Sequence, residues 1–146
     1  MNESAKQIPI LIPSLNPGPE LIELVKDLRV SGFEQVYVVN DGSEAKFDDV
    51  FKTLVESFGV YLLRHNHNRG KGAALKTGIQ AILSQKESIS GLISVDGDGQ
   101  HLVDDVKSMA ERVRNTGDEL ILGTRNFSGK IPLRSKVGNR LTSALL

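Results

Sequence analysis

The pattern of apolar and polar positions predicts strands and helices that alternate along most of the chain. Short apolar runs rich in β-branched residues predict strands, whereas apolar residues three and four positions apart predict helices. The expected strands are residues 8–13, 35–39, 60–63, 92–95 and 119–123. The expected helices are residues 20–30, 47–58, 70–85 and 103–114, with a further helix beginning near Ser135.

This alternation predicts an α/β fold with three layers, in which a mainly parallel sheet carries helices on both faces. The strand runs lack a regular polar alternation, as expected for strands that are covered on both sides. Ligands of such sheets bind beyond the carboxyl ends of the strands. The polar segments that follow four of the strands should therefore lie at one edge, and these are residues 13–16, 40–43, 65–72 and 96–101.

The composition fits a single domain without a strong net charge. The chain has 146 residues, with 18 Lys and Arg against 18 Asp and Glu, so no overall field favours nucleic acid as a partner. The lack of cysteine excludes disulfides and thiolate metal sites and is compatible with the cytoplasm. Residues 123–146 carry basic side chains and no acid, which suits phosphates, an anionic membrane surface or plain solvent exposure.

Asp96 and Asp98 are the strongest candidates for chemistry, because they directly follow the apolar run at residues 92–95. Each charge would need water, a cation or a hydrogen-bond partner if it were buried. Paired carboxylates supply the hard oxygen ligands that Mg²⁺ and Mn²⁺ prefer. The following residues do not match a calcium-binding EF-hand loop. A simple turn that closes the strand is the structural alternative.

Two other strand-end segments carry weaker signals. Residues 65–72 combine glycines and two cations before an expected helix, which suits an anion, but they match neither a Walker loop nor a dinucleotide fingerprint. An ordinary helix-entry loop explains them equally well. His65 and His67 are not expected to bind a metal ion, since no third ligand is close in sequence. Asp41 could accept hydrogen bonds from a nucleoside or simply form part of an Asp-Gly turn.

Taken together, these segments resemble the GT-A nucleotide-sugar glycosyltransferases of family 2, and among them the dolichyl-phosphate mannosyltransferase and polyprenyl-phosphate glycosyltransferase group. The matching segments occur in the family's order and are residues 10–16, 38–43, 68–75, 95–101, 123–125 and 132–140. The resemblance implies a Rossmann-like nucleotide-diphospho-sugar transferase fold. It also implies transfer of a sugar, with inversion, from a UDP- or GDP-linked donor to a polyprenyl (dolichyl or undecaprenyl) phosphate, with Mg²⁺ or Mn²⁺ as cofactor.

The resemblance further implies a role for each matching position. The residues implied in binding the nucleotide sugar are Pro13, Asn16, Asp41, Lys71 and Asp96. The implied metal ligands are Asp96, Asp98 and Gln100. The implied catalytic residues are Asp98, Arg125 and Arg134, the two arginines approaching the donor or acceptor phosphates. The chain departs from the family pattern at Asn40, where an aspartate is commoner, and at Gly97 and Gly99, where bulkier residues are common.

The implied reaction is direct displacement at the anomeric carbon by an acceptor oxygen that is already anionic, so no general base is expected. Such enzymes work at the cytoplasmic face of a membrane. The chain ends within an apolar, helix-like stretch at residues 140–146, so we expect one nucleotide-sugar-binding domain over residues 1–146 that is truncated on its acceptor side. A non-catalytic nucleotide-sugar-binding fragment is an alternative. A sugar nucleotidyltransferase is disfavoured, because Ser14-Leu15-Asn16-Pro17 replaces its basic, glycine-rich segment after the first strand.

Overall fold

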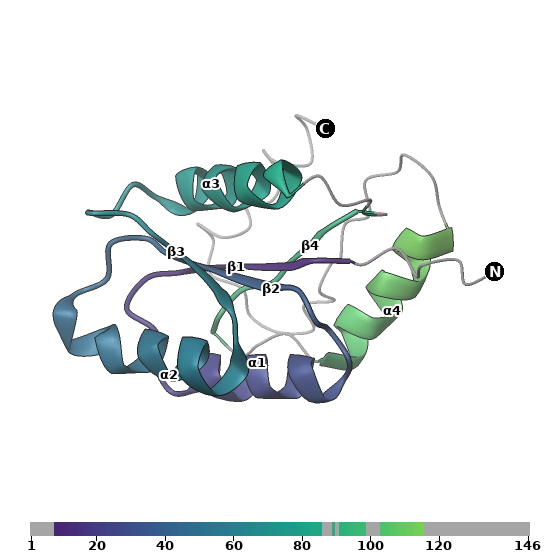
Figure 1. Ribbon diagram of the computed structural model, residues 1–146, viewed down its shortest axis with the longest axis horizontal. Helices are drawn as coiled ribbons and strands as arrows, with labels where there is room; N and C mark the ends of the chain where they lie inside the picture. The colour runs from purple at the N-terminus through teal and green to yellow at the C-terminus, as the bar shows by residue number, and fades with distance from the viewer. Residues whose placement is uncertain (1–7, 86–88, 90, 99–102, 116–146) are drawn as a thin grey trace, which may run out of the picture.

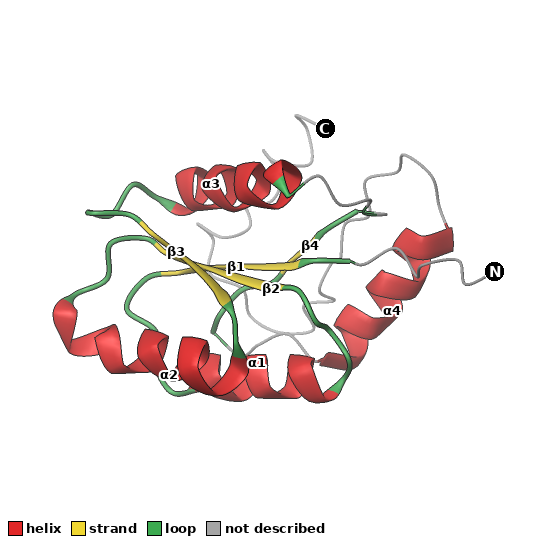
Figure 2. Ribbon diagram, viewed as in Figure 1, coloured by secondary structure: helices red, strands yellow, loops and turns green. Residues whose placement is uncertain are grey.

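The computed structural model describes residues 8–85, 89, 91–98 and 103–115, and these form an α/β unit (Figures 1 and 2). In chain order its elements are β1 (Ile10–Ser14), α1 (Glu20–Val30), β2 (Val36–Asn40), the 3-10 turn η1 (Ala45–Phe47), α2 (Asp48–Phe58), β3 (Tyr61–Arg64), α3 (Lys71–Ser84), β4 (Ile93–Ser94) and α4 (Val103–Asn115).

The four strands form one parallel sheet in the order β3-β2-β1-β4. Strands β1 to β3 extend the sheet in one direction, and the chain then crosses back to place β4 on the other side of β1. The strand order therefore reverses between β1 and β4. A crevice outside the carboxyl ends of the strands forms at such a reversal, and it is where open α/β sheets bind ligands.

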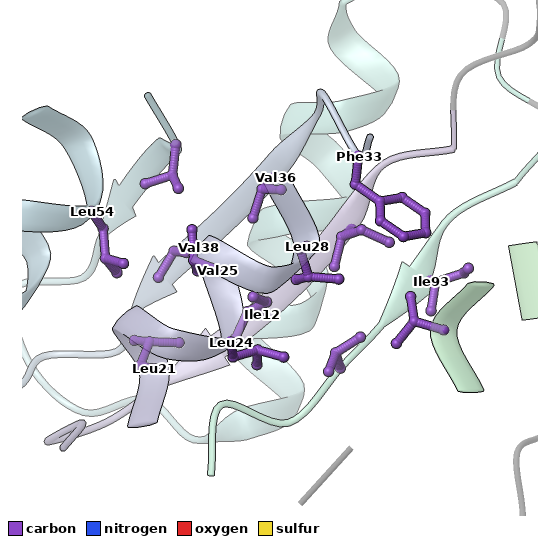
Figure 3. Close-up of a cluster of buried hydrophobic side chains, with 14 of the residues drawn as sticks. Ile12, Leu21, Leu24, Val25, Leu28, Phe33, Val36, Val38, Leu54 and Ile93 are labelled. Atoms are coloured by element: carbon purple, nitrogen blue, oxygen red, sulfur yellow. The ribbon is translucent and has the colours of Figure 1, made fainter. Parts of the chain in front are cut away.

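Alternate residues of the central strands point to opposite faces of the sheet, and each face is covered by helices. On one face, Ile10 and Ile12 pack with α1, α2 and α4, whereas Leu11 faces α3 on the other side (Figures 1 and 2). Figure 3 shows the larger cluster, in which Leu21 and Leu28 of α1 meet the sheet. This burial on both sides explains why the strands read as continuous apolar runs.

Close packing of α3 against β1 depends on Gly78. A β-carbon at this position would lie 2.1 Å from Leu11 Cδ1, which is far inside van der Waals contact. On the opposite face, Arg29 holds the ends of two helices together: its Nε donates to the Phe58 carbonyl over 2.7 Å and its Nη2 to the Gly59 carbonyl over 3.1 Å. These contacts fix the helices that flank the sheet.

The predicted three-layer α/β architecture with a parallel sheet is confirmed, and the element boundaries shift by small amounts. The strand predicted at residues 92–95 shortens to β4, because it pairs with β1 only at Ile10 and Leu11. The helix predicted from residue 47 begins one residue later, after the turn η1. The strand predicted at residues 119–123 and the helix near Ser135 lie outside the described residues.

No helix in the described part of the chain is long and apolar enough to cross a membrane.

Candidate functional site

A pocket of about 300 Å³ lies at the carboxyl end of β1, between the start of α3 and the end of β4. Its lining residues are Pro13, Ser14, Leu15, Asp41, Asn68, Gly70, Lys71, Ala74 and Asp96. A second hollow of about 390 Å³ shares part of this lining and is also bordered by Asn16 and Asp98. The described parts of the polar strand-end segments predicted to meet therefore do so, at the reversal of strand order.

Asp41 is the buried anion of this pocket. It directly follows β2, and the residue is only 3% exposed. Its Oδ1 accepts hydrogen bonds from His65 Nδ1 over 2.6 Å and from the Arg69 backbone amide over 2.9 Å, while its Oδ2 accepts one from the Gly70 amide over 2.9 Å. These contacts join the end of β2 to the loop before α3.

Two opposing effects act on the pKa of Asp41. Burial alone would raise the pKa, because it disfavours the charged form. The hydrogen bonds from His65, Arg69 and Gly70, together with the charge of His65, outweigh burial and lower the pKa of Asp41 below its ordinary value. Asp41 is therefore an anionic, acceptor-only group near neutral pH.

His65 belongs to the same buried network, although the sequence offered it no role. It follows β3, and its side chain is 4% exposed. Its Nε2 lies 2.8 Å from Thr77 Oγ1 on α3, so both ring nitrogens have protein partners. The expectation that His65 does not bind a metal ion agrees with this arrangement. The strand register explains why the two residues meet: Asn40 pairs with Arg64, which places the next residues, Asp41 and His65, side by side.

The loop after β2 is closed by short polar contacts that the Asn-Asp-Gly-Ser sequence supplies. Asn40 Oδ1 accepts a bond from the Ser43 amide over 2.8 Å. Gly42 has φ +72°, and a β-carbon there would lie 2.1 Å from the His67 carbonyl carbon. Glycine thus permits the loops after β2 and β3 to touch. Asn40, one of the positions where the chain departs from the family pattern, therefore stabilises this turn through its side chain.

Asn16 joins the loop after β1 to the same turn. Its backbone amide donates to Ser43 Oγ over 2.8 Å, and its Oδ1 accepts a bond from the Glu44 amide over 2.9 Å. It adopts a left-handed conformation with φ +50°. Asn16 borders the second hollow rather than the pocket that Asp41 lines.

Lys71 and Asp96 form an ion pair across the pocket. Lys71 is the first residue of α3, and its Nζ bonds Asp96 Oδ1 just after β4. Their side chains are 59% and 41% exposed, so the pair is open to solvent. An anion placed here would meet the lysine and the amino end of a helix, both of which favour negative charge.

Asp96 and Asp98 border the second hollow and offer two carboxylates to a cation. No group of three metal-binding carboxylate, imidazole or thiolate side chains occurs among the residues described. Two carboxylates nevertheless fit the way Mg²⁺ is held in many phosphate-binding sites, where substrate oxygens and water complete the coordination. The side chains present are therefore compatible with a divalent ion that arrives with a phosphate ligand.

The structure brings together part of the predicted site. Pro13, Asp41, Lys71 and Asp96 line one pocket. Asn16 and Asp98 line the adjoining hollow. The other predicted residues, Gln100, Arg125 and Arg134, lie outside the described residues, so their roles stay predictions.

Comparison with known proteins gives a consistent picture. The model of the family named Glycosyl transferase family 2 matches residues 10–140. An uncharacterised protein of Methanocaldococcus jannaschii is 35% identical over 144 residues, covering 95% of this chain and 57% of its own length. A UDP-N-acetylglucosamine–dolichyl-phosphate N-acetylglucosaminyltransferase of Methanococcus voltae is 27% identical, covering 92% of this chain and 59% of its own length. A dolichyl-phosphate beta-glucosyltransferase of Trichomonas vaginalis is 26% identical, over 68% of this chain and 32% of its own. The chain thus spans a little over half the length of the two archaeal relatives.

Proposed function

Because the chain belongs to glycosyl transferase family 2, we propose that its pocket binds the nucleotide-diphosphate part of a sugar donor. The observation that carries this proposal is the meeting of Asp41, Lys71 and Asp96 in one pocket at the reversal of strand order. Asp41 only accepts hydrogen bonds and so suits a donor group of a nucleoside. Lys71, at the start of a helix, suits a phosphate. Asp96 suits a cation.

The residues at the two ends of the pocket would divide the work of donor binding. Asp41 accepts hydrogen bonds from N–H or O–H groups of the base or ribose, and Pro13 shapes the wall beside it. Asn16 supports the loop between them through its contacts with Ser43 and Glu44. Lys71 donates to the diphosphate.

The metal site is proposed at Asp96 and Asp98, with Gln100 as a further oxygen ligand. When bound there, Mg²⁺ or Mn²⁺ supplies positive charge that stabilises the departing diphosphate. Asp96 would then exchange its bond with Lys71 for the ion, and the lysine would turn to the phosphates.

The proposed reaction of the whole protein is sugar transfer to a polyprenyl phosphate. An anionic phosphate oxygen of the acceptor forms a bond to the anomeric carbon as the bond to the donor diphosphate breaks, and the configuration inverts. Arg125 and Arg134 would stabilise charge on the donor or acceptor phosphates. This acceptor places the reaction at the cytoplasmic face of a membrane. This acceptor class is supported by two relatives, both of which are named as dolichyl-phosphate sugar transferases.

The chain itself is proposed to be the donor-binding part of such an enzyme, in one domain over residues 1–146. It should therefore bind the donor nucleotide more readily than it transfers sugar. Rapid transfer to a lipid phosphate by this chain alone would contradict that division of roles.

The test is calorimetric titration of the 146-residue chain with UDP, GDP, ADP and CDP, each with and without Mn²⁺. We expect UDP or GDP to bind best and to bind more tightly with the ion than without it, and Asp98→Ala to lose this gain. Asp104→Asn, which changes a carboxylate whose side chain is 92% exposed on α4, is the matched control and should bind as the unaltered chain does. Absence of metal-dependent UDP and GDP binding would refute the proposed function.

A further inference from the structure

His65 is a buried histidine whose orientation is fixed on every side. Its backbone amide donates to the Asn40 carbonyl over 2.9 Å, which continues the pairing of β2 with β3. Its ring lies between Asp41 on β2's carboxyl end and Thr77 on α3, with contacts of 2.6 and 2.8 Å. The ring therefore joins two elements that approach the pocket from different layers of the fold.

The chemistry of its partners determines where the imidazole carries a proton. The Asp41 carboxylate is anionic and only accepts, so Nδ1 must donate. Thr77 is a hydroxyl and can donate or accept, so it satisfies Nε2 whether or not that nitrogen is protonated. The proton on Nδ1 is thus required by the carboxylate, while Thr77 holds the other end of the ring.

The contacts also divide the two oxygens of Asp41 into different roles. Among the described residues, Oδ1 accepts two hydrogen bonds, from His65 and from the Arg69 amide. Oδ2 accepts one, from the Gly70 amide. A carboxylate has about four acceptor sites, two on each oxygen. The oxygen that accepts fewer hydrogen bonds, Oδ2, therefore keeps a site for a ligand. Rotation of the carboxylate out of this orientation would break its bonds to the Arg69 and Gly70 amides and turn Oδ2 away at the same time.

We infer that His65 is a positioning residue for nucleotide recognition: by donating through Nδ1, it holds Asp41 so that both of its oxygens anchor the loop before α3 and Oδ2, which keeps an acceptor site, is presented to the nucleoside. The inference rests on the proposed function, since it assigns His65 a part in the same donor pocket. Thr77 completes the device, because it supports the ring from α3. His65 itself contacts no substrate in this account.

Two substitutions of similar size separate the two nitrogens of the ring. His65→Asn keeps an N–H donor close to the position of Nδ1 and loses the contact with Thr77. His65→Gln keeps a polar group close to Nε2 and loses the contact with Asp41. The matched control is His67→Asn, which changes an exposed histidine two residues along the same loop.

The readouts are calorimetric affinities for UDP, GDP and inorganic pyrophosphate with Mn²⁺, and hydrogen exchange of the Arg69 and Gly70 amides without ligand. We expect His65→Gln to lower the affinity for UDP or GDP, whichever the unaltered chain binds better, by about 10-fold, as for one lost hydrogen bond to a charged group. Its pyrophosphate affinity should stay within about twofold, because phosphate recognition lies at Lys71. Exchange of the Arg69 amide should accelerate, and that of the Gly70 amide should accelerate less, because Gly70 also donates to Asn68 Oδ1 over 2.9 Å. His65→Asn should stay within about threefold of the unaltered chain in every readout.

A purely structural histidine would give a different result. Equal weakening by His65→Asn and His65→Gln, or a parallel loss of pyrophosphate and nucleotide affinity, would overturn the inference. If His65→Gln does not fold, Thr77→Val decides in its place: the imidazole, unlike the shorter asparagine side chain of His65→Asn, then lacks its support from α3, so nucleotide affinity should fall, whereas Thr77→Ser should bind as the unaltered chain does. No effect of Thr77→Val would overturn the inference.

The failure of the proposed function would be visible separately. In that case the unaltered chain would bind neither UDP nor GDP, before any variant is compared. If the unaltered chain binds UDP or GDP and His65→Gln binds it equally well, the proposed function is supported and the inferred role of His65 is refuted.

Discussion

The two carboxylates that line the pocket, Asp41 and Asp96, are held in opposite ways. Asp41 is 3% exposed and accepts three hydrogen bonds, two of them from backbone amides. Asp96 has a side chain that is 41% exposed, and one of its partners is the long, flexible side chain of Lys71. The first is part of the framework that shapes the pocket, whereas the second is placed to change partners.

This difference follows from where each charge lies. A buried carboxylate must have its partners supplied by the fold, because leaving it without them costs several kcal/mol. An exposed ion pair contributes little to stability, since water replaces either partner readily. The proposed donor site uses both kinds of group: a fixed end to recognise the nucleoside and an exchangeable end to admit a cation and a diphosphate.

The largest expected difference in the free energy of unfolding is between variants that lack one or the other carboxylate. Asp41→Ala should lower the free energy of unfolding by about 3 kcal/mol, because it removes the buried acceptor of His65 Nδ1 and of the Arg69 amide, and one of the two acceptors of the Gly70 amide. Asp96→Ala should lower it by less than about 1 kcal/mol, as for an exposed pair. Urea unfolding of both variants measures the difference, with Asp104→Ala as an exposed control. Equal losses at Asp41 and Asp96 would remove the distinction between a fixed and an exchangeable end.

A second test concerns the close contact of the loops on the Asp41 side. Gly42 and Gly70 both have positive φ, at +72° and +93°, but only Gly42 has atoms within 4 Å of a β-carbon position. Gly42→Ala should cost about 2 kcal/mol in the free energy of unfolding, from strain and from separation of the loops. Gly70→Ala should cost about 1 kcal/mol, from backbone strain alone, because φ +93° with ψ 157° is a conformation confined essentially to glycine. Thermal and urea unfolding compare them, and a larger loss at Gly70 would contradict the loop contact.

The pH dependence of stability sharpens the same comparison. The hydrogen bonds of Asp41 lower its pKa in the folded state, whereas the unfolded value is about 3.9. A lowered folded pKa means that the contribution is fully present above the unfolded value and is lost as the pH falls through the folded one. Urea unfolding between pH 3 and 7 should therefore show that the advantage of the unaltered chain over Asp41→Asn shrinks below about pH 4. An advantage that stays constant with pH would contradict the lowered pKa.

Much of the framework of this comparison was predictable from the sequence, because it depends on local patterns. Apolar runs marked the strands, and the rule that parallel strands present their carboxyl ends together brought Asp41, Lys71 and Asp96 to one edge. The ordered motifs gave the family. The ion pair of Lys71 with Asp96 was not predicted, since neither residue's side-chain direction follows from its place at an element's end.

The buried network was missed for a different reason. Asp41, His65 and Thr77 lie far apart in sequence, and each has an ordinary local explanation as a turn, loop or helix residue. They meet only because the pairing of β2 with β3 sets one particular register and α3 then packs across it. Gln100, Arg125 and Arg134 stay predictions, since they lie outside the described residues.

The smallest expected change in stability, and the most direct test of the exchangeable end, is Lys71→Met. The free energy of unfolding should change by less than about 0.5 kcal/mol, because the ion pair is exposed. Affinity for UDP or GDP with Mn²⁺ should fall about 10-fold, since a charged hydrogen bond to phosphate is lost. Mn²⁺ alone should bind no more weakly than before, because the lysine no longer competes for Asp96. Lys76→Met, an exposed lysine on the same helix, is the matched control. Weaker binding of Mn²⁺ alone to Lys71→Met, or an equal loss of nucleotide affinity in Lys76→Met, would show that Lys71 and the ion do not exchange at Asp96.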